Sequence, residues 1–199
     1  MKIIGLTGGI GSGKSFVAKV ATMHFNVLHI STDEIARTQM LKGGVSYGRV
    51  IEEFSRYADD LLLEDGEINR PALSKVVLND PELLEKLDSI THPAVIDEVN
   101  SIIENEKEAG RYDAVLIETA LIYEAGIDST CDEVWYVYAP RLTRRKRLAL
   151  DRGYSDERID GFFNGQKPEE EFLRRSTRTV PNCDDVTEED MIRIIRGYL

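Results

Sequence analysis

Residues 8–15 read Gly-Gly-Ile-Gly-Ser-Gly-Lys-Ser, and this stretch decides the fold class. Four residues separate Gly8 from Gly13, and Lys14 and Ser15 follow directly, which is the spacing of a Walker A loop. Glycines let the backbone wrap closely around phosphate oxygens, so that successive N–H groups point at the anion. The spacing therefore predicts a site for a nucleoside triphosphate. Its expected binding residues are Gly8, Gly9, Ile10, Gly11, Ser12, Gly13, Lys14 and Ser15.

Two of these residues have side chains with expected roles of their own. Lys14 reaches the β- and γ-phosphates in loops of this kind, so we expect it to take part in catalysis. The Ser15 hydroxyl is placed to hold Mg²⁺. A nucleoside triphosphate and Mg²⁺ are therefore the expected ligands of the loop.

The residues on either side of the loop fit a strand-loop-helix unit. Residues 2–6, Lys-Ile-Ile-Gly-Leu, form a short apolar run typical of a buried strand. Phe16, Val17, Val20 and Ala21 recur at helical spacing, so the loop leads into a helix whose N-terminus faces the phosphates. The alternative is a glycine-rich turn that binds nothing, and the eight ordered positions with both flanks disfavour it.

Further apolar runs predict the rest of a sheet. They cover residues 26–30, 114–117, 133–138 and 178–180. Runs of this length that alternate with helices indicate a parallel sheet covered on both faces. The prediction is an α/β, three-layer fold of the P-loop NTPase type with a parallel five-stranded sheet. Ligands of such folds gather at the carboxyl ends of strands, where the loop, Asp33 and Glu118 all fall.

Two insertions divide the expected single domain, whose core is residues 1–38, 111–140 and 176–199. Residues 39–110 are far longer than a strand crossover needs and predict a helical insertion that binds the acceptor. One helix is expected to begin near Asp80-Pro81, and another near Thr91-His92-Pro93.

Residues 141–175 predict a helical lid, and a last helix is expected to open at Thr187 with Asp190 three residues on. A phosphate-binding core with one insertion for an acceptor and another that closes over the phosphates is the layout of small-molecule kinases.

The charge and composition of the chain indicate which classes of binding partner to expect. The 199 residues carry a net charge of −11, which argues against non-specific nucleic-acid binding. No apolar run approaches the length of a membrane span. Cys131 and Cys183 lack metal-ligand spacing and suggest a reducing compartment, so we expect a cytoplasmic protein. Small-molecule partners and a monomer or small homo-oligomer are expected.

Asp33 and Glu118 are the candidate acidic residues. Phosphoryl transfer to an alcohol needs a carboxylate to orient the hydroxyl and accept its proton, and Asp33 follows the second predicted strand. Asp33 is equally well explained as a first-turn acid favoured by a helix dipole. Glu118 ends a strand as a Walker B acid does when it holds Mg²⁺, and a solvated strand-end carboxylate is the alternative.

A cationic cluster in the second insertion is the candidate phosphate clamp. Its members are Arg141, Arg144, Arg145, Lys146, Arg147 and Arg152. Arg144 and Arg147 lie three apart on one helical face and are placed to bind transferring phosphates. Arg147 and Asp151 are four apart, so a surface ion pair is the competing interpretation. His92 is either a substrate contact or a structural residue at a helix start.

Several motifs together resemble the dephospho-coenzyme A kinase family. Residues 4–15, Ile-Gly-Leu-Thr-Gly-Gly-Ile-Gly-Ser-Gly-Lys-Ser, are similar to the family's start almost letter for letter. Residues 33–37, Asp-Glu-Ile-Ala-Arg, resemble its acceptor-site motif. Residues 65–73 and 90–93 resemble two stretches of its helical substrate domain, so the similarity runs from end to end.

The resemblance implies transfer of the ATP γ-phosphate to the ribose 3′-hydroxyl of dephospho-coenzyme A, the last step of coenzyme A synthesis. It implies Asp33 as the base, with Arg37, Arg70 and His92 near the acceptor. It also implies that Gln166 lies in the lid and that Asn182 lies on the adenine side of the nucleotide.

The second half of the chain departs from the family pattern. Residues 118–124, Glu-Thr-Ala-Leu-Ile-Tyr-Glu, stand where an Asp-x-Pro-Leu-Leu-Phe-Glu motif is usual. Asp151-Arg152 reverses a lid pair, Phe162 replaces a common arginine, and Ser176-Thr177 replaces Ala-Asp. The alternatives are a diverged P-loop kinase for another nucleotide or metabolite, and a catalytically weak nucleotide-binding regulator.

Overall fold

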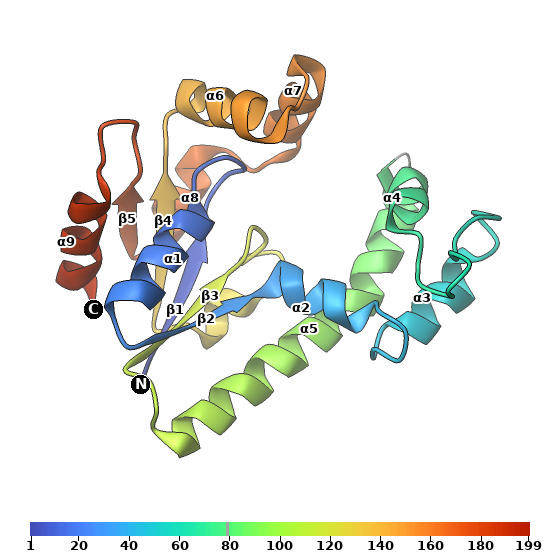
Figure 1. Ribbon diagram of the computed structural model, residues 1–199, viewed down its shortest axis with the longest axis horizontal. Helices are drawn as coiled ribbons and strands as arrows, with labels where there is room; N and C mark the ends of the chain where they lie inside the picture. Colours follow the sequence, from blue (N-terminus) through green and yellow to red (C-terminus); the bar gives the residue numbers. More distant parts are fainter. Residues whose placement is uncertain (79) are drawn as a thin grey trace. The chain divides into compact units, whose positions relative to one another are not determined.

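Five parallel strands form the sheet, in the order β2-β3-β1-β4-β5 (Figure 1). The computed structural model describes residues 1–78 and 80–199 of the chain. The strands are β1 (Lys2–Thr7), β2 (Val27–Ser31), β3 (Ala114–Glu118), β4 (Glu133–Tyr138) and β5 (Arg178–Pro181). Every predicted strand is present within a residue or two of its expected bounds. The predicted parallel five-stranded sheet is therefore confirmed.

Helices connect the strands, and they follow in chain order. They are α1 (Lys14–His24), α2 (Thr32–Gln39), α3 (Tyr47–Phe54), α4 (Arg70–Leu78), α5 (Pro81–Ala109), the 3-10 helix η1 (Ile127–Thr130), α6 (Arg141–Arg152), α7 (Asp156–Gly165), α8 (Glu169–Arg175) and α9 (Glu188–Tyr198). Thr187 caps α9 as predicted, because its side chain accepts from the Asp190 N–H and the Asp190 side chain accepts from the Thr187 N–H.

The sheet is covered on both faces. On one face, Leu6, Leu116 and Trp135 pack against buried residues of α1 and α9, such as Val17 and Met191. This cluster is the main core, and it fixes the start of α1 beside the end of β1.

The other face of the sheet lies against the segment around η1 and against α8. A Cβ atom on Gly5 would overlap the Ile122 side chain, so that segment approaches the strand closely. The ring of Phe172 on α8 stacks on Tyr136 of β4, with 5.3 Å between ring centroids. The sheet therefore lies between two layers, as the sequence predicts.

Helix α5 differs from the expectation. The sequence predicts a new helix near Thr91-His92-Pro93, whereas α5 continues through Pro93 as one helix of 29 residues. The prediction was wrong because apolar residues keep helical spacing on both sides of the proline. Ile90, Val95 and Val99 are all buried. Pro93 removes one backbone hydrogen bond without ending the helix.

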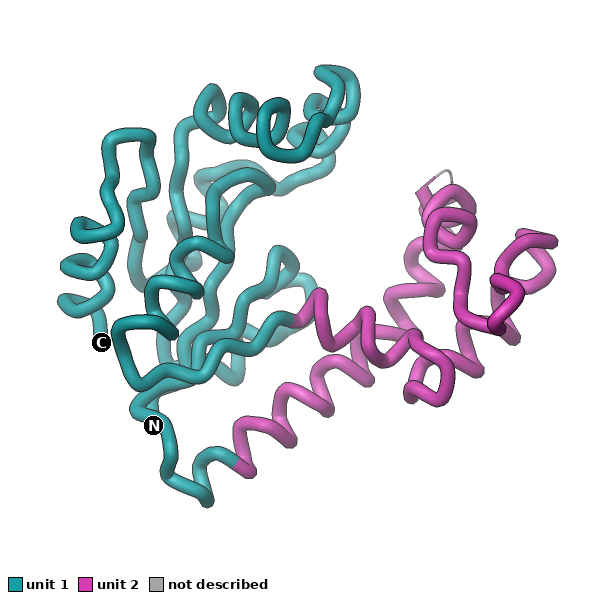
Figure 2. Tube along the Cα trace, viewed as in Figure 1, with its two compact units in different colours: residues 1–31, 106–199 teal, residues 32–105 magenta. Residues whose placement is uncertain are grey.

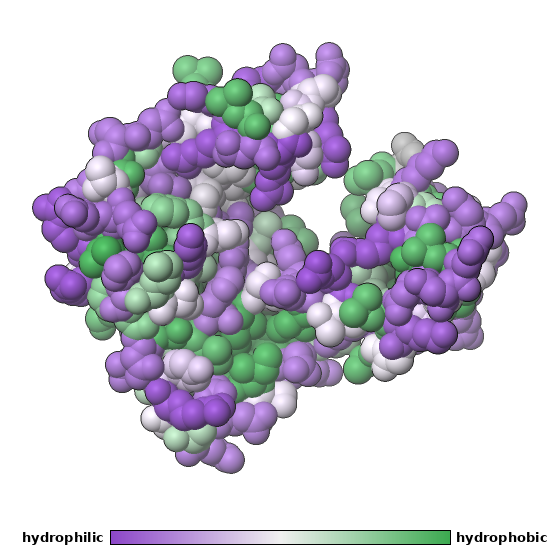
Figure 3. All heavy atoms as spheres, viewed as in Figure 1, coloured by the Kyte–Doolittle hydropathy of each residue, from purple (hydrophilic) through white to green (hydrophobic). Residues whose placement is uncertain are grey.

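The chain divides into two compact units, shown in different colours in Figure 2. One unit contains residues 1–31 and 106–199, with the sheet and helices α6 to α9. The other contains residues 32–105, whose own core gathers around Phe54, Val50 and Leu61. Hydrophilic residues cover much of the face drawn in Figure 3. Across residues 1–78 and 80–199, no helix combines the length and apolar character that a membrane span needs.

Candidate active site

The glycine-rich loop connects the end of β1 to the start of α1. Gly13 is the N-cap of α1 and has a φ of 89°, in the left-handed region that favours glycine. A Cβ atom on Gly13 would overlap the amide of Asn182, and one on Gly9 would overlap the Arg144 guanidinium. Gly13 is therefore needed for its backbone conformation, and Gly9 leaves room for the Arg144 guanidinium beside the loop backbone.

A buried carboxylate lies beside the first turn of α1. Glu118, at the end of β3, accepts a hydrogen bond from the Ser15 hydroxyl, with 2.7 Å between Oγ and Oε1. Its second oxygen, Oε2, lies 2.9 Å from Nε2 of His29 on β2. Lys14 donates from Nζ to the Gly8 carbonyl at 2.9 Å. These residues meet because β1, β2 and β3 end at the same edge of the sheet.

Glu118 is an anion in this setting. Burial by itself would raise the pKa of Glu118, but hydrogen bonds from His29 and Ser15 and the charge of Lys14 outweigh burial, so the pKa lies below its usual value. Ser15 and Glu118 thus present a hydroxyl and an ionised carboxylate together. Hard oxygen donors of this kind suit a divalent cation that also binds phosphate.

Within residues 1–78 and 80–199, no three His, Cys, Asp or Glu side chains form a metal site by themselves. A cation held by Ser15 and Glu118 would take its other ligands from phosphate oxygens and water, as Mg²⁺ does in nucleotide enzymes.

Helix α6 brings a half-buried arginine to the loop. The Arg144 guanidinium lies against Gly9 and over the Phe163 ring, 4.7 Å from its centroid. Its Nε is buried and has no hydrogen-bond partner in the described part of the chain. Burial lowers the pKa of Arg144 from its usual value. A partly desolvated cation in contact with a phosphate-binding loop is stabilised when an anion binds there.

Arg147 and Asn182, which lie far from the loop in the sequence, hold the loop through its Ser12 carbonyl. Asn182, just after β5, donates to the Ser12 carbonyl at 2.7 Å. Arg147 donates to the same carbonyl at 3.3 Å and to the Asn182 carbonyl at 3.0 Å. An ion pair with Asp184 at 3.5 Å completes its contacts. Arg147 thus pairs with Asp184, and not with Asp151 as the competing interpretation of the sequence had it.

Gln166 connects the end of α7 to the same loop. Its side-chain Oε1 accepts from the Ile10 N–H at 3.2 Å. Gln166 belongs to the helical segment 141–175. This segment therefore contacts a backbone N–H of the predicted phosphate site directly. Gln166, Arg144 and Arg147 therefore all meet the loop.

The residues expected near the acceptor lie in the other compact unit. Asp33 is in the first turn of α2 and follows the end of β2 by two residues. Arg37 lies four residues on, on the same face of α2. Arg70 begins α4, and His92 lies within α5, where its Nε2 is 3.5 Å from Asp88. The roles of these four residues stay predictions.

Helices α2 and α5 are tied together inside this unit. The Gln39 amide, at the end of α2, donates to the Ala94 carbonyl of α5 at 2.8 Å. His92, two residues before Ala94, is thus inside a helix next to α2 and not at a helix start as expected.

The residues that depart from the family pattern make structural contacts. The Thr177 hydroxyl accepts from the Val134 N–H and donates to the Val134 carbonyl, both at 2.9 Å, which joins the start of β5 to β4. The Ser176 hydroxyl pairs with that of Tyr123 at 2.9 Å. Phe162 stacks on Tyr154 in the segment between α6 and α7.

His29 is the site residue that sequence reasoning missed. None of the sequence motifs assigns His29 a role, yet it contacts Glu118 directly. The available signal was alternation along the strand. His29 and Ser31 face the same side of β2, and the parallel register pairs Ser31 with Glu118. Only the strand order shows that β2 and β3 are neighbours.

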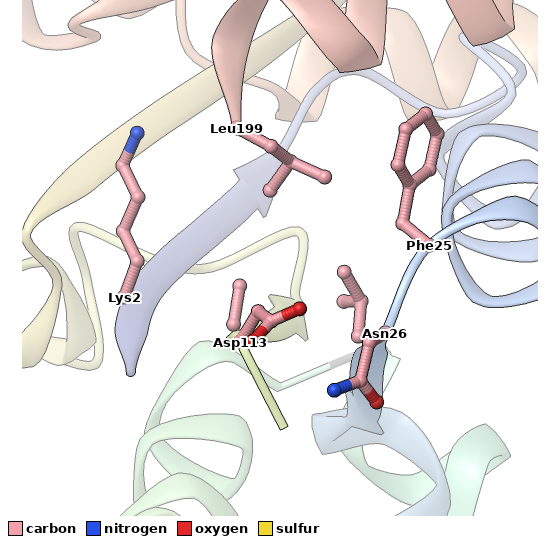
Figure 4. Close-up of a pocket in the computed structure, with 7 residues that line it drawn as sticks. Lys2, Phe25, Asn26, Asp113 and Leu199 are labelled. Carbon is pink, nitrogen blue, oxygen red and sulfur yellow. The ribbon is translucent and has the colours of Figure 1, made fainter.

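A separate small cavity of about 250 Å³ lies at the amino ends of the strands (Figure 4). Its lining residues are Lys2, Phe25, Asn26, Val27, Asp113, Ala114 and Leu199. Ligands of parallel sheets bind at the carboxyl ends of strands, so this cavity is apart from the candidate site.

The sheet, the loop before α1 and the acid at the end of β3 define a P-loop enzyme of the nucleotide-dependent kinase class. The family model described as dephospho-CoA kinase matches residues 2–188. The dephospho-CoA kinase of Moorella thermoacetica is 37% identical over 94% of this chain and 86% of its own length. That of Carboxydothermus hydrogenoformans is 34% identical over 100% of this chain and 95% of its own.

A solved structure has the same fold. The dephospho-CoA kinase from Campylobacter jejuni is similar with a TM-score of 0.71 and 22% identity, covering 100% of this chain and 98% of that one. This chain belongs to the dephospho-CoA kinase family. It is accordingly an ATP-dependent kinase, and its family acts in the final step of coenzyme A synthesis.

Proposed function

We propose that this chain transfers the γ-phosphoryl group of ATP to the ribose 3′-hydroxyl of dephospho-coenzyme A. The observation that carries the proposal is the group formed by Lys14, Ser15 and Glu118 at the glycine-rich loop of a dephospho-CoA kinase family member. In phosphoryl transfer, positioning and charge stabilisation supply most of the catalysis, and this group offers both.

Mg²⁺ is the proposed metal, with Ser15 and Glu118 as its protein ligands. The donor set fits, because the hydroxyl and the buried, ionised carboxylate are only 2.7 Å apart. When bound, Mg²⁺ neutralises charge on the β- and γ-phosphates.

The phosphate side of the site is assigned to the loop and to α6. The backbone N–H groups of residues 8–15 and the Lys14 ammonium bind the phosphates. Arg144 adds a half-buried charge beside Gly9. Arg147 acts mainly through its bonds to Ser12 and Asn182, which hold the loop in shape. Asn182 is proposed to border the adenine.

The acceptor side is assigned to the helical unit. Asp33 is the proposed base that orients the 3′-hydroxyl and accepts its proton. Arg37, Arg70 and His92 are proposed to bind the acceptor, whose phosphates suit cations. Residues 39–110 are proposed as the acceptor-binding insertion and residues 141–175 as the lid.

Two further properties are proposed with the activity. The cysteines Cys131 and Cys183 are free thiols, which supports a reducing, cytoplasmic setting. A monomer or small homo-oligomer is proposed for the assembly, and sedimentation of the purified chain with and without ATP measures it.

The acceptor is tested by following ADP release from ATP and Mg²⁺ with a panel of alcohols. Dephospho-coenzyme A should give the highest kcat/KM, and mass spectrometry should find one added phosphate on its ribose. Two controls sharpen the assay. The 3′-deoxy analogue of dephospho-coenzyme A lacks only the reacting hydroxyl, and Lys14→Ala reports any contaminating kinase. Equal ADP release with the 3′-deoxy analogue, or faster release with adenosine, AMP or shikimate, would contradict the proposal.

A further inference from the structure

His29 is placed on the sheet so that its side chain reaches the acid at the end of β3. The parallel register pairs His29 with Leu116 and Ser31 with Glu118. Leu116 packs in the cluster that contains the buried face of α1. Side chains that pair across neighbouring strands lie on the same face, so His29 lies on the α1 side of the sheet.

The Glu118 carboxylate is bonded at both oxygens. Oε1 lies 2.7 Å from the Ser15 hydroxyl, and Oε2 lies 2.9 Å from Nε2 of His29. The Glu118 side chain is only 12% exposed. Because an ionised carboxylate has no proton to give, the His29 ring must donate from Nε2.

We propose that His29 is a positioning residue that fixes the Glu118 carboxylate for the divalent cation of the bound nucleotide. The inference rests on the proposed role of Glu118 as a metal ligand. Oε1 is the oxygen beside Ser15, and Oε2 is the oxygen turned to His29. A cation shared by Ser15 and Oε1 leaves the His29 bond in place, and that bond then holds the orientation of the carboxylate.

The size of the effect follows from other metal sites. Partners that hydrogen-bond a metal ligand fix its orientation, and their loss commonly weakens metal binding about 10–100-fold. The Ser15 hydroxyl alone is a weak restraint on the carboxylate, since the same hydroxyl is also a ligand. Loss of the His29 donor should therefore affect metal affinity more than nucleotide affinity.

Three variants separate the donor from the bulk of the ring. His29→Gln carries an amide N–H the same number of bonds from Cα as Nε2 and keeps the donor. His29→Leu keeps apolar bulk and removes the donor. His24→Leu is the matched control, because His24 makes the other His–Glu contact of this unit, with Glu188 at 3.3 Å at the far end of α1.

The experiment measures Mn²⁺ binding to the full chain with a non-hydrolysable ATP analogue, by electron paramagnetic resonance of free Mn²⁺. His29→Leu should weaken Mn²⁺ binding about 10-fold or more, while His29→Gln stays within about 3-fold and His24→Leu is unchanged. Binding of the analogue in EDTA should be the same in all variants. In turnover assays, His29→Leu should raise the Mg²⁺ concentration for half-maximal rate by a similar factor.

Glu118→Gln, measured alongside, separates the role of Glu118 as a metal ligand from the role of His29 as its positioning residue. If Glu118→Gln binds Mn²⁺ as tightly as wild type, Glu118 is no ligand and the inference falls with that assignment. If Glu118→Gln is weakened but His29→Leu is not, His29 has no positioning role and the proposed function stands. Equal losses in His29→Leu and His29→Gln also overturn the inference. Circular dichroism checks folding, and His29→Ala replaces His29→Leu if the latter is unfolded.

Discussion

Glu118 illustrates how single residues set the chemistry of this site. Its carboxylate is buried, which would favour the neutral acid, yet His29, Ser15 and Lys14 together hold its pKa below the usual value of 4.5. The folded chain therefore binds a proton at Glu118 less readily than the unfolded chain does. This difference links stability to pH in the acid range.

The pH dependence of unfolding should report Glu118 directly. The stabilisation from the ionised carboxylate is complete above pH 4.5 and is lost as the pH falls through the lower pKa of the folded state. Urea unfolding between pH 6 and pH 3 should show a steeper acid loss in wild type than in Glu118→Gln. Glu98→Gln, which removes an exposed carboxylate of α5, controls for net charge. Equal slopes in wild type and Glu118→Gln would contradict the assignment.

Asp33 is the residue on which turnover should depend most. Asp33→Asn removes the proposed base but keeps the size of the side chain, so kcat should fall about 10²–10⁴-fold. Binding of ATP, measured by calorimetry, should stay within about 2-fold, because the loop at residues 8–15 is untouched. Asp97→Asn makes the same change on the exposed side of α5 and should leave kcat unaltered. Unchanged kinetics in Asp33→Asn would remove Asp33 from the mechanism.

Helix α6 presents its arginines to different surroundings. Arg144 packs on Phe163 and against Gly9, with its Nε buried. Arg145, the next residue, makes ion pairs with Asp156 and Asp160 of α7. A turn of 100° between neighbouring helix positions separates the two side chains. Helix α6 thus contributes both a candidate phosphate ligand, Arg144, and the ion pairs of Arg145 that join α6 to α7.

Matched substitutions of these neighbours should separate catalysis from structure. Arg144→Gln should lower kcat about 10²-fold, because a preorganised charge at the phosphates is lost. Arg145→Gln should leave kcat within about 3-fold and lower the thermal midpoint slightly, because partly exposed ion pairs contribute little. Steady-state kinetics and thermal unfolding measure both effects. A loss of kcat in Arg145→Gln as large as in Arg144→Gln would mean that only the summed charge of α6 matters.

The whole molecule is strongly acidic, with a net charge of −11, although α6 is cationic. The local charge lies beside a phosphate-binding loop, and hydrophilic residues cover much of the face in Figure 3. Small anions therefore meet a local positive site, whereas a long polyanion meets the repulsion of the entire surface.

Duplex DNA should consequently bind only weakly. At about 0.15 M salt, a 20-bp duplex should show a Kd weaker than about 10⁻⁴ M in fluorescence anisotropy, because a chain with a net charge of −11 repels the phosphate backbone. Tighter binding that Lys146→Glu abolishes would show that α6 overrides the net charge. Lys146 is exposed on α6, which makes it a suitable reporter.

Local patterns predicted much of this architecture. The five strands follow from short apolar runs, and the caps of α5 and α9 from Asp80-Pro81 and from Thr187 with Asp190. The break expected at Pro93 was wrong, because burial of Ile90 and Val95 outweighs the cost of one proline. A local rule predicts that a proline destabilises a helix, but the burial of neighbouring apolar side chains decides whether the helix continues.

The sequence alone determined the phosphate-binding loop, the parallel sheet and the family, because each is carried by short motifs or apolar runs that are read along the chain. Only the tertiary structure brought His29 to Glu118, Arg144 to Gly9 and Asn182 to Ser12. His29 and Glu118 are 89 positions apart in the sequence, and Asn182 and Ser12 are 170 positions apart. Strand order and helix packing set them, and the local sequence pattern does not state which strands or helices become neighbours.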